Sequence, residues 1–407
     1  MRSSTLYIFS PLLFFMLYFR ASMDPILNLT KVGGIGFGAL LNLLVVVYFM
    51  FVCLKNKFVI PKSFFYVWGA FILIGLFSIF QSPDKVTSLR SFFAVLTYFS
   101  IFNMSYYFCR TKKDVSFLVM FIVLSAVVPF GFSIFEIIFP DGSTSRNGFR
   151  LSGSFSHPNI YAFYLVLVSS LCFFSLNQRV LTFPPRFIQF AKVILLLSLV
   201  CLVLTKTRSA WLGFIVVIAV YGMIYNRRYL LYLTVFGLIV LAIPSVQERV
   251  LEIFSGNSVD ELTLGESLNS YAWRKVVWTA SWDFILQKPL FGHGYDTFSY
   301  YFLDFFPLEE NKGFDAHNTY VQIAFDMGFL GALSYLLIFP VIFYRVFVIY
   351  SLDRSGGAVI IGLMVSYLVV GYSDNMLFYL SYNWYFWLVL GAFFYASRHY
   401  KVQRENE

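Results

Sequence analysis

Apolar runs long enough to cross a lipid bilayer recur along almost the whole chain, and charged residues are largely confined to the segments between them. A transmembrane helix needs about 20 apolar residues to cross a hydrocarbon core of about 30 Å. Because lipid offers the backbone no hydrogen bonds, such spans must be helical. We therefore predict an all-α polytopic membrane protein with about twelve spans, at residues 6–19, 35–54, 64–80, 91–109, 115–139, 158–176, 193–205, 209–225, 229–246, 325–344, 358–373 and 378–396.

The composition excludes an ordinary soluble protein. Of the 407 residues, 59% are hydrophobic and 13% are charged, whereas soluble domains carry about 25% charged residues. The net charge of +9 is dispersed over many segments, while a nucleic-acid-binding surface would gather it on one face. No nucleic-acid partner is therefore predicted. The first span lacks a small-residue cleavage site and precedes Arg20, so we expect an anchor rather than a signal peptide.

The distribution of lysine and arginine predicts the orientation, because these residues gather in short cytoplasmic loops. With the N-terminus inside, the inner segments hold seventeen of them: Arg2, Lys55, Lys57, Lys62, Arg110, Lys112, Lys113, Arg179, Arg186, Lys192, Arg227, Arg228, Arg345, Arg354, Arg398, Lys401 and Arg404. The short outer turns hold eight: Arg20, Lys31, Lys85, Arg90, Arg146, Arg150, Lys206 and Arg208. Both termini are therefore predicted to be cytoplasmic.

One outer segment, residues 247–316, is far longer than the other predicted loops. It separates residues 1–246, with nine predicted spans, from residues 317–407, with three more spans and a cytoplasmic tail. Long loops without structure are uncommon in compact proteins unless they are functional. We therefore expect this large loop to contain or to cover a functional site.

The large loop is predicted to contain short helices. Trp273, Val277, Ala280 and Phe284 recur at spacings that place them on one helical face, and the turn residues that follow predict an end near residue 287. An amphipathic helix of this kind can lie in the membrane interface. It can equally line a groove for a lipid or a sugar, and the two interpretations are compatible.

No metal and no cofactor are predicted. The large loop carries more acids than bases, but their spacing lacks the pattern of a calcium-binding loop, so a solvated acidic face is expected. The cysteines lie in or at the ends of apolar runs without a CxxC pair, which predicts free thiols; they are Cys53, Cys109, Cys172 and Cys201.

His317 is the leading candidate for proton transfer. With Asn318 it stands where the large loop re-enters the membrane, ahead of an apolar run that contains Gly328 and Gly331. A neutral imidazole near pH 7 can accept a proton, and glycines at this spacing permit close helix packing. Asp315 is close enough in sequence to orient the ring.

Two further histidines fall on the outer side, His157 and His293. Proline follows the first and glycines surround the second, which is typical of tight turns. At each of them a structural role is favoured, because a lone histidine in a loop is more often a hydrogen-bonded loop residue than a catalytic one, and both are kept as supporting residues.

Arg208 and Lys206 lie in a short outer turn between two spans, and Arg150 occupies another outer turn close to His157. An arginine at the membrane boundary can simply extend toward lipid phosphates. Together, however, these three cations would form a pocket at the level of the lipid headgroups. Guanidinium groups bind phosphate through paired, charge-assisted hydrogen bonds, so the pocket suits a diphosphate-linked lipid.

These motifs resemble the bacterial O-antigen ligase family, which is related to O-antigen and exopolysaccharide polymerases. Arg208 and Leu212 form an R-x3-L pattern, and His317-Asn318 with Gly328 and Gly331 form H-N-x9-G-x-x-G. The segments RLSGSFSHPN and KPLFGHGYDTF, the predicted twelve-span layout and the large outer loop strengthen the similarity.

The resemblance implies a GT-C-like membrane glycosyltransferase of the bacterial inner membrane, with its active site on the periplasmic face. Its donor would be a glycan linked to undecaprenyl or another polyprenyl diphosphate, and neither a metal nor a nucleotide sugar would be used. His317 would be the base. Arg208, with Arg150 and Lys206, would hold the diphosphate, while Asn318, Asp315, His157 and His293 would support the site.

Three functions remain open at this stage. A ligase would transfer the glycan to a sugar hydroxyl of the lipid A core, and a polymerase would transfer it to another lipid-linked glycan. A transporter or flippase for a lipid-linked glycan would use charges within the membrane. The candidates for such charges, Glu136, Asp326 and Asp374, lie near predicted span ends, so we favour the enzyme.

Overall fold

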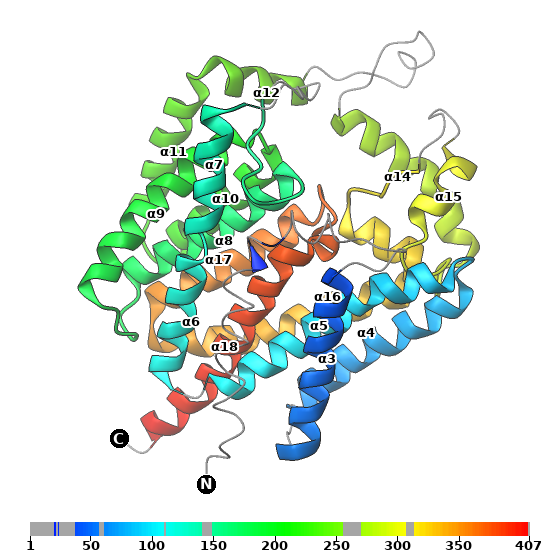
Figure 1. Cartoon of the computed structure of the whole chain (residues 1–407), viewed down its shortest axis with the longest axis horizontal. Helices are drawn as coiled ribbons and strands as arrows, with labels where there is room; N and C mark the ends of the chain where they lie inside the picture. The colour runs from blue at the N-terminus through cyan, green and yellow to red at the C-terminus, as the bar shows by residue number, and fades with distance from the viewer. Residues whose placement is uncertain are drawn as a thin grey trace.

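A computed structural model of the chain describes residues 20–21, 23, 37–56, 61–109, 111–140, 149–254, 270–306 and 313–405. All regular structure in these ranges is helical (Figure 1). The predicted span at residues 6–19 lies outside the described residues. The helices are α3 (Phe37–Asn56), α4 (Lys62–Gln81), α5 (Lys85–Phe108), α6 (Lys112–Leu124), α7 (Val127–Ile138), α8 (Pro158–Asn177), α9 (Pro185–Leu204), α10 (Arg208–Ile224), α11 (Arg228–Leu241), α12 (Pro244–Phe254), α14 (Ser270–Gln287), α15 (Phe298–Phe305), α16 (Thr319–Leu352), α17 (Arg354–Val370), the short 3-10 turn η1 (Met376–Phe378) and α18 (Leu380–Glu405).

Length and apolar composition make this a multi-pass membrane protein. Six helical segments of the described chain can cross a membrane: Phe37–Lys55, Lys62–Gln81, Lys112–Ile138, Pro158–Asn177, Pro185–Leu204 and Thr319–Ile349. The shorter helices α10, α11 and α17 are also apolar. The remaining helices of the predicted count, α5 and α18, are long but carry more polar residues.

Helices α5 and α18 are more polar because they pack against protein rather than lipid. The hydroxyl of Ser105 in α5 donates to the carbonyl oxygen of Leu388 in α18 at 2.6 Å. A Cβ on Gly391 would lie 2.2 Å from the carbonyl oxygen of Phe102, so only glycine permits this approach. Small residues at helix contacts allow such packing, and α18 accordingly runs through the middle of the bundle (Figure 1).

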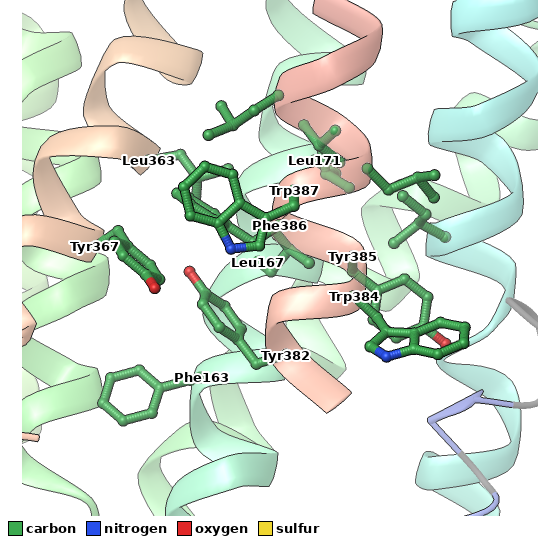
Figure 2. Packing of buried hydrophobic residues seen from close by; sticks show 14 of the residues in the cluster. Phe163, Leu167, Leu171, Leu363, Tyr367, Tyr382, Trp384, Tyr385, Phe386 and Trp387 are labelled. Atoms are coloured by element: carbon green, nitrogen blue, oxygen red, sulfur yellow. The ribbon is translucent and has the colours of Figure 1, made fainter. Parts of the chain in front are cut away.

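Aromatic side chains fill the space around α18 (Figure 2). The ring of Tyr367 in α17 stacks on Phe386 with centroids 4.1 Å apart. The hydroxyl of Tyr367 and the indole of Trp387 both donate to the amide oxygen of Asn383, at 3.0 and 3.1 Å. The hydroxyl of Tyr367 and the indole of Trp387 are therefore both paired with Asn383, which helps to fix the register of α17 against α18.

Helices α6 and α7 correspond to one predicted span, residues 115–139, and the chain breaks between them at Ser125 and Ala126. Pro129 explains the break, because its ring clashes with the carbonyl group four residues earlier, that of Ser125, and it has no amide hydrogen to donate. The hydroxyl of Ser125 instead donates to Ile122 at 2.6 Å and contacts the hydroxyl of Tyr164 at 2.7 Å.

The hydrogen bonds between loops sort into two groups at opposite ends of the bundle. At one end, Asp353 accepts from the amide of Arg179 at 3.0 Å, and the Ser355 hydroxyl donates to the carbonyl oxygen of Asn177 at 2.7 Å. At the other end, Asn159 bonds to Asp374. Alternate loops thus meet at alternate ends, as the predicted series of antiparallel spans requires.

The described part of the large loop forms a helical cap. Helix α14 is the predicted amphipathic helix, and its Val277 and Ile285 pack with Phe298 and Phe302 of α15 and with Phe325 of α16. Trp273, Ala280 and Phe284 border the same cluster, so the predicted face is the buried one. Helices α14 and α15 lie together at the upper right of Figure 1, beside the start of α16.

All four cysteines are free thiols, as expected from the sequence. They are Cys53, Cys109, Cys172 and Cys201, and each lies in or next to a helix of the bundle.

Candidate active site

Three helices begin at the same end of the bundle, and each begins at a candidate residue. His157 caps α8, with its Nδ1 accepting from the amide of Asn159 at 3.1 Å. Asn318 caps α16 by accepting from the amides of Tyr320 and Val321 at 2.9 and 3.1 Å. Arg208 is the first residue of α10. Unpaired amides and the helix dipole make such ends attractive to anions.

Arg150 joins two of these helix starts. Its guanidinium donates to the side chain of Asn159 at 2.9 Å, to the hydroxyl of Thr207 at 3.0 Å and to the carbonyl oxygen of Thr205 at 2.9 Å. Asn159 lies in the first turn of α8, and Thr207 directly precedes α10. The predicted proximity of Arg150 to the Arg208 turn is therefore present, and these three hydrogen bonds make Arg150 a structural cross-link.

Lys206 and Arg208 lie in and just after the turn that Arg150 holds. Lys206 has a left-handed backbone with φ 52, which reverses the chain sharply between α9 and α10. The side chains of Lys206 and Arg208 are half-buried, and both engage in interactions within the protein. The turn thus brings two cations to the end of the bundle at which α8 and α16 begin.

Asp374 connects this group to the start of α16. Its Oδ1 accepts from the side chain of Asn159 at 3.3 Å and from the hydroxyl of Tyr379 at 2.6 Å. Its backbone oxygen accepts from the hydroxyl of Thr319 at 2.9 Å. The side chain is fully buried, and its Oδ2 has no hydrogen-bond partner. A buried carboxylate oxygen is costly to leave unpaired.

His317 lies within this electrostatic environment. Burial lowers the pKa of His317 from its ordinary value of 6.5 to about 4; Arg274 and His157 act in the same direction, and Asp374 opposes them. The ring of Trp273 lies 6.2 Å from the imidazole, edge to face. At neutral pH the ring is therefore uncharged and able to accept a proton.

Arg274 is a site residue that the sequence analysis missed. It lies on α14, next to Trp273, and its charge acts on both His317 and Tyr379. The cap thereby contributes a cation to a site built mainly by the bundle. Arg274 lies beside the predicted apolar face of this helix, and residues beside such a face border whatever the helix covers. The sequence pattern could therefore have indicated Arg274 as a candidate site residue.

Asp374, not Asp315, is the carboxylate that acts on His317. Asp315 acts on Asp296, whose side chain bonds to Ser91 of α5. Burial raises the pKa of Asp296 to about 6, with Ser91 opposing and Asp315 assisting that shift. Asp315 and Asp296 thus belong to the contact between cap and bundle. The expectation for Asp315 followed sequence proximity, which does not determine side-chain contacts.

His293 supports the cap and lies apart from His317. It is buried, with its Nε2 2.7 Å from the carbonyl oxygen of Phe284 and its ring stacked on Phe325 at 4.8 Å. His157 has an exposed side, and its pKa is lowered by partial burial and by Arg150, with Asp374 opposing. Of the two supporting histidines, only His157 shares the surroundings of His317.

Gly328 has a role that differs from helix packing. It has φ 69 and interrupts α16, and a Cβ there would lie 2.4 Å from the carbonyl oxygen of Leu290. The break lets residues 289–294 pair with α16: the amide of Phe329 donates to Pro289 at 2.7 Å, and the amide of His293 donates to Phe325 at 2.9 Å. The predicted glycine motif therefore fastens the cap to the helix that follows His317.

One protein-family model matches part of the chain. Residues 193–336 match the family model described as O-antigen ligase. The match confirms the resemblance that the motifs indicated, and it spans Arg208, Arg274, His317 and Gly328. The matched segment includes α10, the described part of the cap and the start of α16. No curated protein matches the chain.

Proposed function

We propose that this protein is a membrane glycosyltransferase that moves a glycan from a polyprenyl diphosphate to the hydroxyl group of an acceptor sugar. The observation that carries the proposal is the neutral, largely buried imidazole of His317, which shares its surroundings with the cation Arg274 and the buried carboxylate of Asp374.

In the proposed reaction, His317 takes the proton from the acceptor hydroxyl as its oxygen attacks the anomeric carbon of the donor glycan. The bond from that carbon to the diphosphate oxygen breaks, and polyprenyl diphosphate leaves with the electron pair. Charge therefore grows on the leaving group during the step. Fixed cations and helix N-termini stabilise such charge without reorganisation.

The cations divide into two groups in this proposal. Arg208 and Lys206, at the start of α10, and Arg274, on the cap, hold the diphosphate. Arg150 contributes charge but mainly fixes Asn159 and the turn before α10 through its hydrogen bonds. Asp374 stabilises the imidazolium that forms when His317 takes the proton, since its charge favours the protonated ring.

The reaction as written needs no metal and no nucleotide sugar, because the base and the cations come from the chain. The distribution of lysine and arginine supports an outward-facing site with both termini in the cytoplasm, and in the proposed function this site faces the periplasm at the bacterial inner membrane. Membrane lipid surrounds the apolar spans. We favour the lipid A core as acceptor, which makes the protein an O-antigen ligase, in accord with the family description.

A gene deletion followed by gel analysis of glycolipids tests this function. A ligase deletion leaves long glycan chains unattached to the core, whereas a polymerase deletion leaves single repeat units on the core. Complementation with His317→Ala or Arg208→Ala should leave the deletion pattern unchanged. Complementation with Arg228→Ala should restore the glycolipid pattern of the unmodified protein, because Arg228 is exposed and lies at the start of α11, at the other end of α10 from Arg208. Full restoration by His317→Ala would refute the proposal.

A further inference from the structure

His317 has an unusual backbone conformation for a residue with a side chain. Its φ of 47 lies in the left-handed region, which L residues other than glycine seldom adopt. Such a conformation persists only where surrounding contacts enforce it. The contacts that enforce it here involve the peptide groups on both sides of the histidine.

Two side-chain amides hold the backbone on either side of the histidine. The amide of Ala316, before the histidine, donates to Oε1 of Gln322 at 3.0 Å. The amide of Asn318, after the histidine, donates to Oδ1 of Asn375 at 2.8 Å. Gln322 and Asn375 also bond to each other, with Nδ2 of Asn375 donating to Oε1 of Gln322 at 3.1 Å. They form one continuous clamp across His317.

The clamp continues into the cap. Nε2 of Gln322 donates to Oδ2 of Asp326 at 3.0 Å, and the carboxylate of Asp326 accepts from the amides of Asp296 and Thr297 at 2.9 and 3.1 Å. The indole of Trp278 on α14 donates to the carbonyl oxygen of Ala316 at 2.6 Å. The position of the cap is thus linked by hydrogen bonds to the peptide that precedes His317.

Burial makes this network expensive to disturb. Gln322 and Asp326 are each 1% exposed, and Asn375 is 4% exposed. A buried donor that loses its acceptor has no water to replace it. Loss of Oε1 of Gln322 would leave the amide of Ala316 and Nδ2 of Asn375 without their acceptor. The backbone at His317 would then relax toward a more common conformation.

We propose that Gln322 and Asn375 are positioning residues that fix the ring of His317 against the reacting groups and couple that ring to the cap through Asp326. The inference rests on His317 being the base of the proposed reaction. Neither amide takes part in proton transfer; each acts through the backbone of the histidine.

Removal of the clamp acceptor should slow catalysis without weakening donor binding. Gln322→Met keeps the length of the side chain but removes its polar atoms. Displacement of a catalytic group by about 1 Å can cost on the order of 100-fold in rate, so kcat should fall by about 10- to 100-fold. KM for the lipid-linked glycan extracted from the deletion strain should stay within about twofold, because the cations that bind it are unchanged.

The pH profile separates positioning from a loss of folded protein. The charged and titratable groups that act on His317 are Arg274 from α14, His157 from the start of α8 and Asp374 from the end of α17. If the ring leaves its site, its pKa returns toward the ordinary 6.5. The acidic limb of kcat/KM should then move to higher pH in Gln322→Met. A smaller folded fraction would lower the whole profile without moving the limb.

Matched variants sharpen the test. Gln322→Glu retains an oxygen that can accept from Ala316 and should recover part of the activity that Gln322→Met loses. Asn375→Asp should likewise exceed Asn375→Leu. Asn103→Leu removes a buried amide from α5, near the end of that helix opposite Ser91, and should leave the limb in place.

The outcomes distinguish the positioning inference from the proposed function. If His317→Asn is inactive while Gln322→Met and Asn375→Leu retain the kcat and the acidic limb of the unmodified protein, the clamp has no positioning role. The positioning role is also overturned if Gln322→Met has reduced activity but an unmoved acidic limb, and Gln322→Glu recovers none of that activity. If His317→Asn is itself fully active, the proposed function fails first.

Discussion

At the scale of single residues, the chemistry depends on an imidazole whose charge is set by neighbours from distant parts of the chain. Arg274 and His157 disfavour the protonated ring and Asp374 favours it, while burial has the largest effect and lowers the pKa to about 4. A base must be neutral to act. The unmodified protein should therefore stay active down to mildly acidic pH and lose activity as pH falls through about 4.

Replacement of Arg274 should have two separable effects. Arg274→Ala removes a cation that stabilises the leaving diphosphate, and loss of one such group commonly costs about 2.7 to 4 kcal/mol in the barrier. It also removes a charge that lowers the pKa of His317, so the acidic limb should move to higher pH. Transfer rates across a pH series measure both, with the exposed Lys275→Ala as the neighbouring control. An unchanged rate would remove Arg274 from the site.

Replacement of Asp374 should shift the acidic limb of the pH–rate profile in the direction opposite to that expected for Arg274→Ala. Asp374→Asn removes the charge that raises the pKa of His317, so the limb should move to lower pH. The rate should also fall by about 100-fold or more, since the imidazolium loses its partner and proton transfer contributes on this order. Asp283→Asn on the exposed face of α14 is the control. A limb that moves upward would contradict the assigned role of Asp374.

The sequence motifs predicted His317 and Arg208 as site residues, because each stands at a polar junction between apolar runs. They did not identify Arg274 or Asp374 as partners of His317. Both reach the histidine through folding of distant segments, and spacing along the chain carries no information on such contacts. For Asp315, adjacency in sequence was the whole argument, whereas the carboxylate whose charge raises the pKa of His317 is that of Asp374.

At the scale of elements, the break in α16 at Gly328 should be essential to the fold of the cap. Gly328→Ala would force an L residue into φ 69 and place a Cβ 2.4 Å from the carbonyl oxygen of Leu290. We expect a lower melting temperature and loss of transfer. Gly69→Ala in α4, where a Cβ meets nothing within 4 Å, should be neutral or stabilising by up to about 1 kcal/mol. Equal melting temperatures for the two variants would contradict this role of the break.

The apolar pattern located α3, α4, α8 and α10 to within two residues at each end, because a lipid-facing helix must be apolar throughout its span. It placed the start of the helix after His317 at residue 325, whereas α16 begins at Thr319. The difference arises because Gln322 and Asp326 face protein partners rather than lipid. Hydropathy likewise did not reveal the break between α6 and α7, which depends on Pro129.

At the scale of the whole molecule, the proposed function requires the cap and the starts of α8, α10 and α16 to face the periplasm. In a variant without native cysteines, Asp283→Cys on the cap should react with a membrane-impermeant maleimide in intact cells once the outer membrane is permeabilised. Arg228→Cys should react only after the inner membrane is opened. Both side chains are exposed. The reverse labelling pattern would place the site in the cytoplasm.

The most direct measurement is a single-turnover assay of polyprenyl diphosphate release by purified protein in lipid discs, supplied with lipid-linked glycan and lipid A core from the deletion strain. His317→Asn should bind the donor with unchanged affinity yet release the diphosphate at least about 100-fold more slowly, because proton transfer is lost. Release at the rate of the unmodified protein would contradict the assignment of His317 as the base on which the account depends.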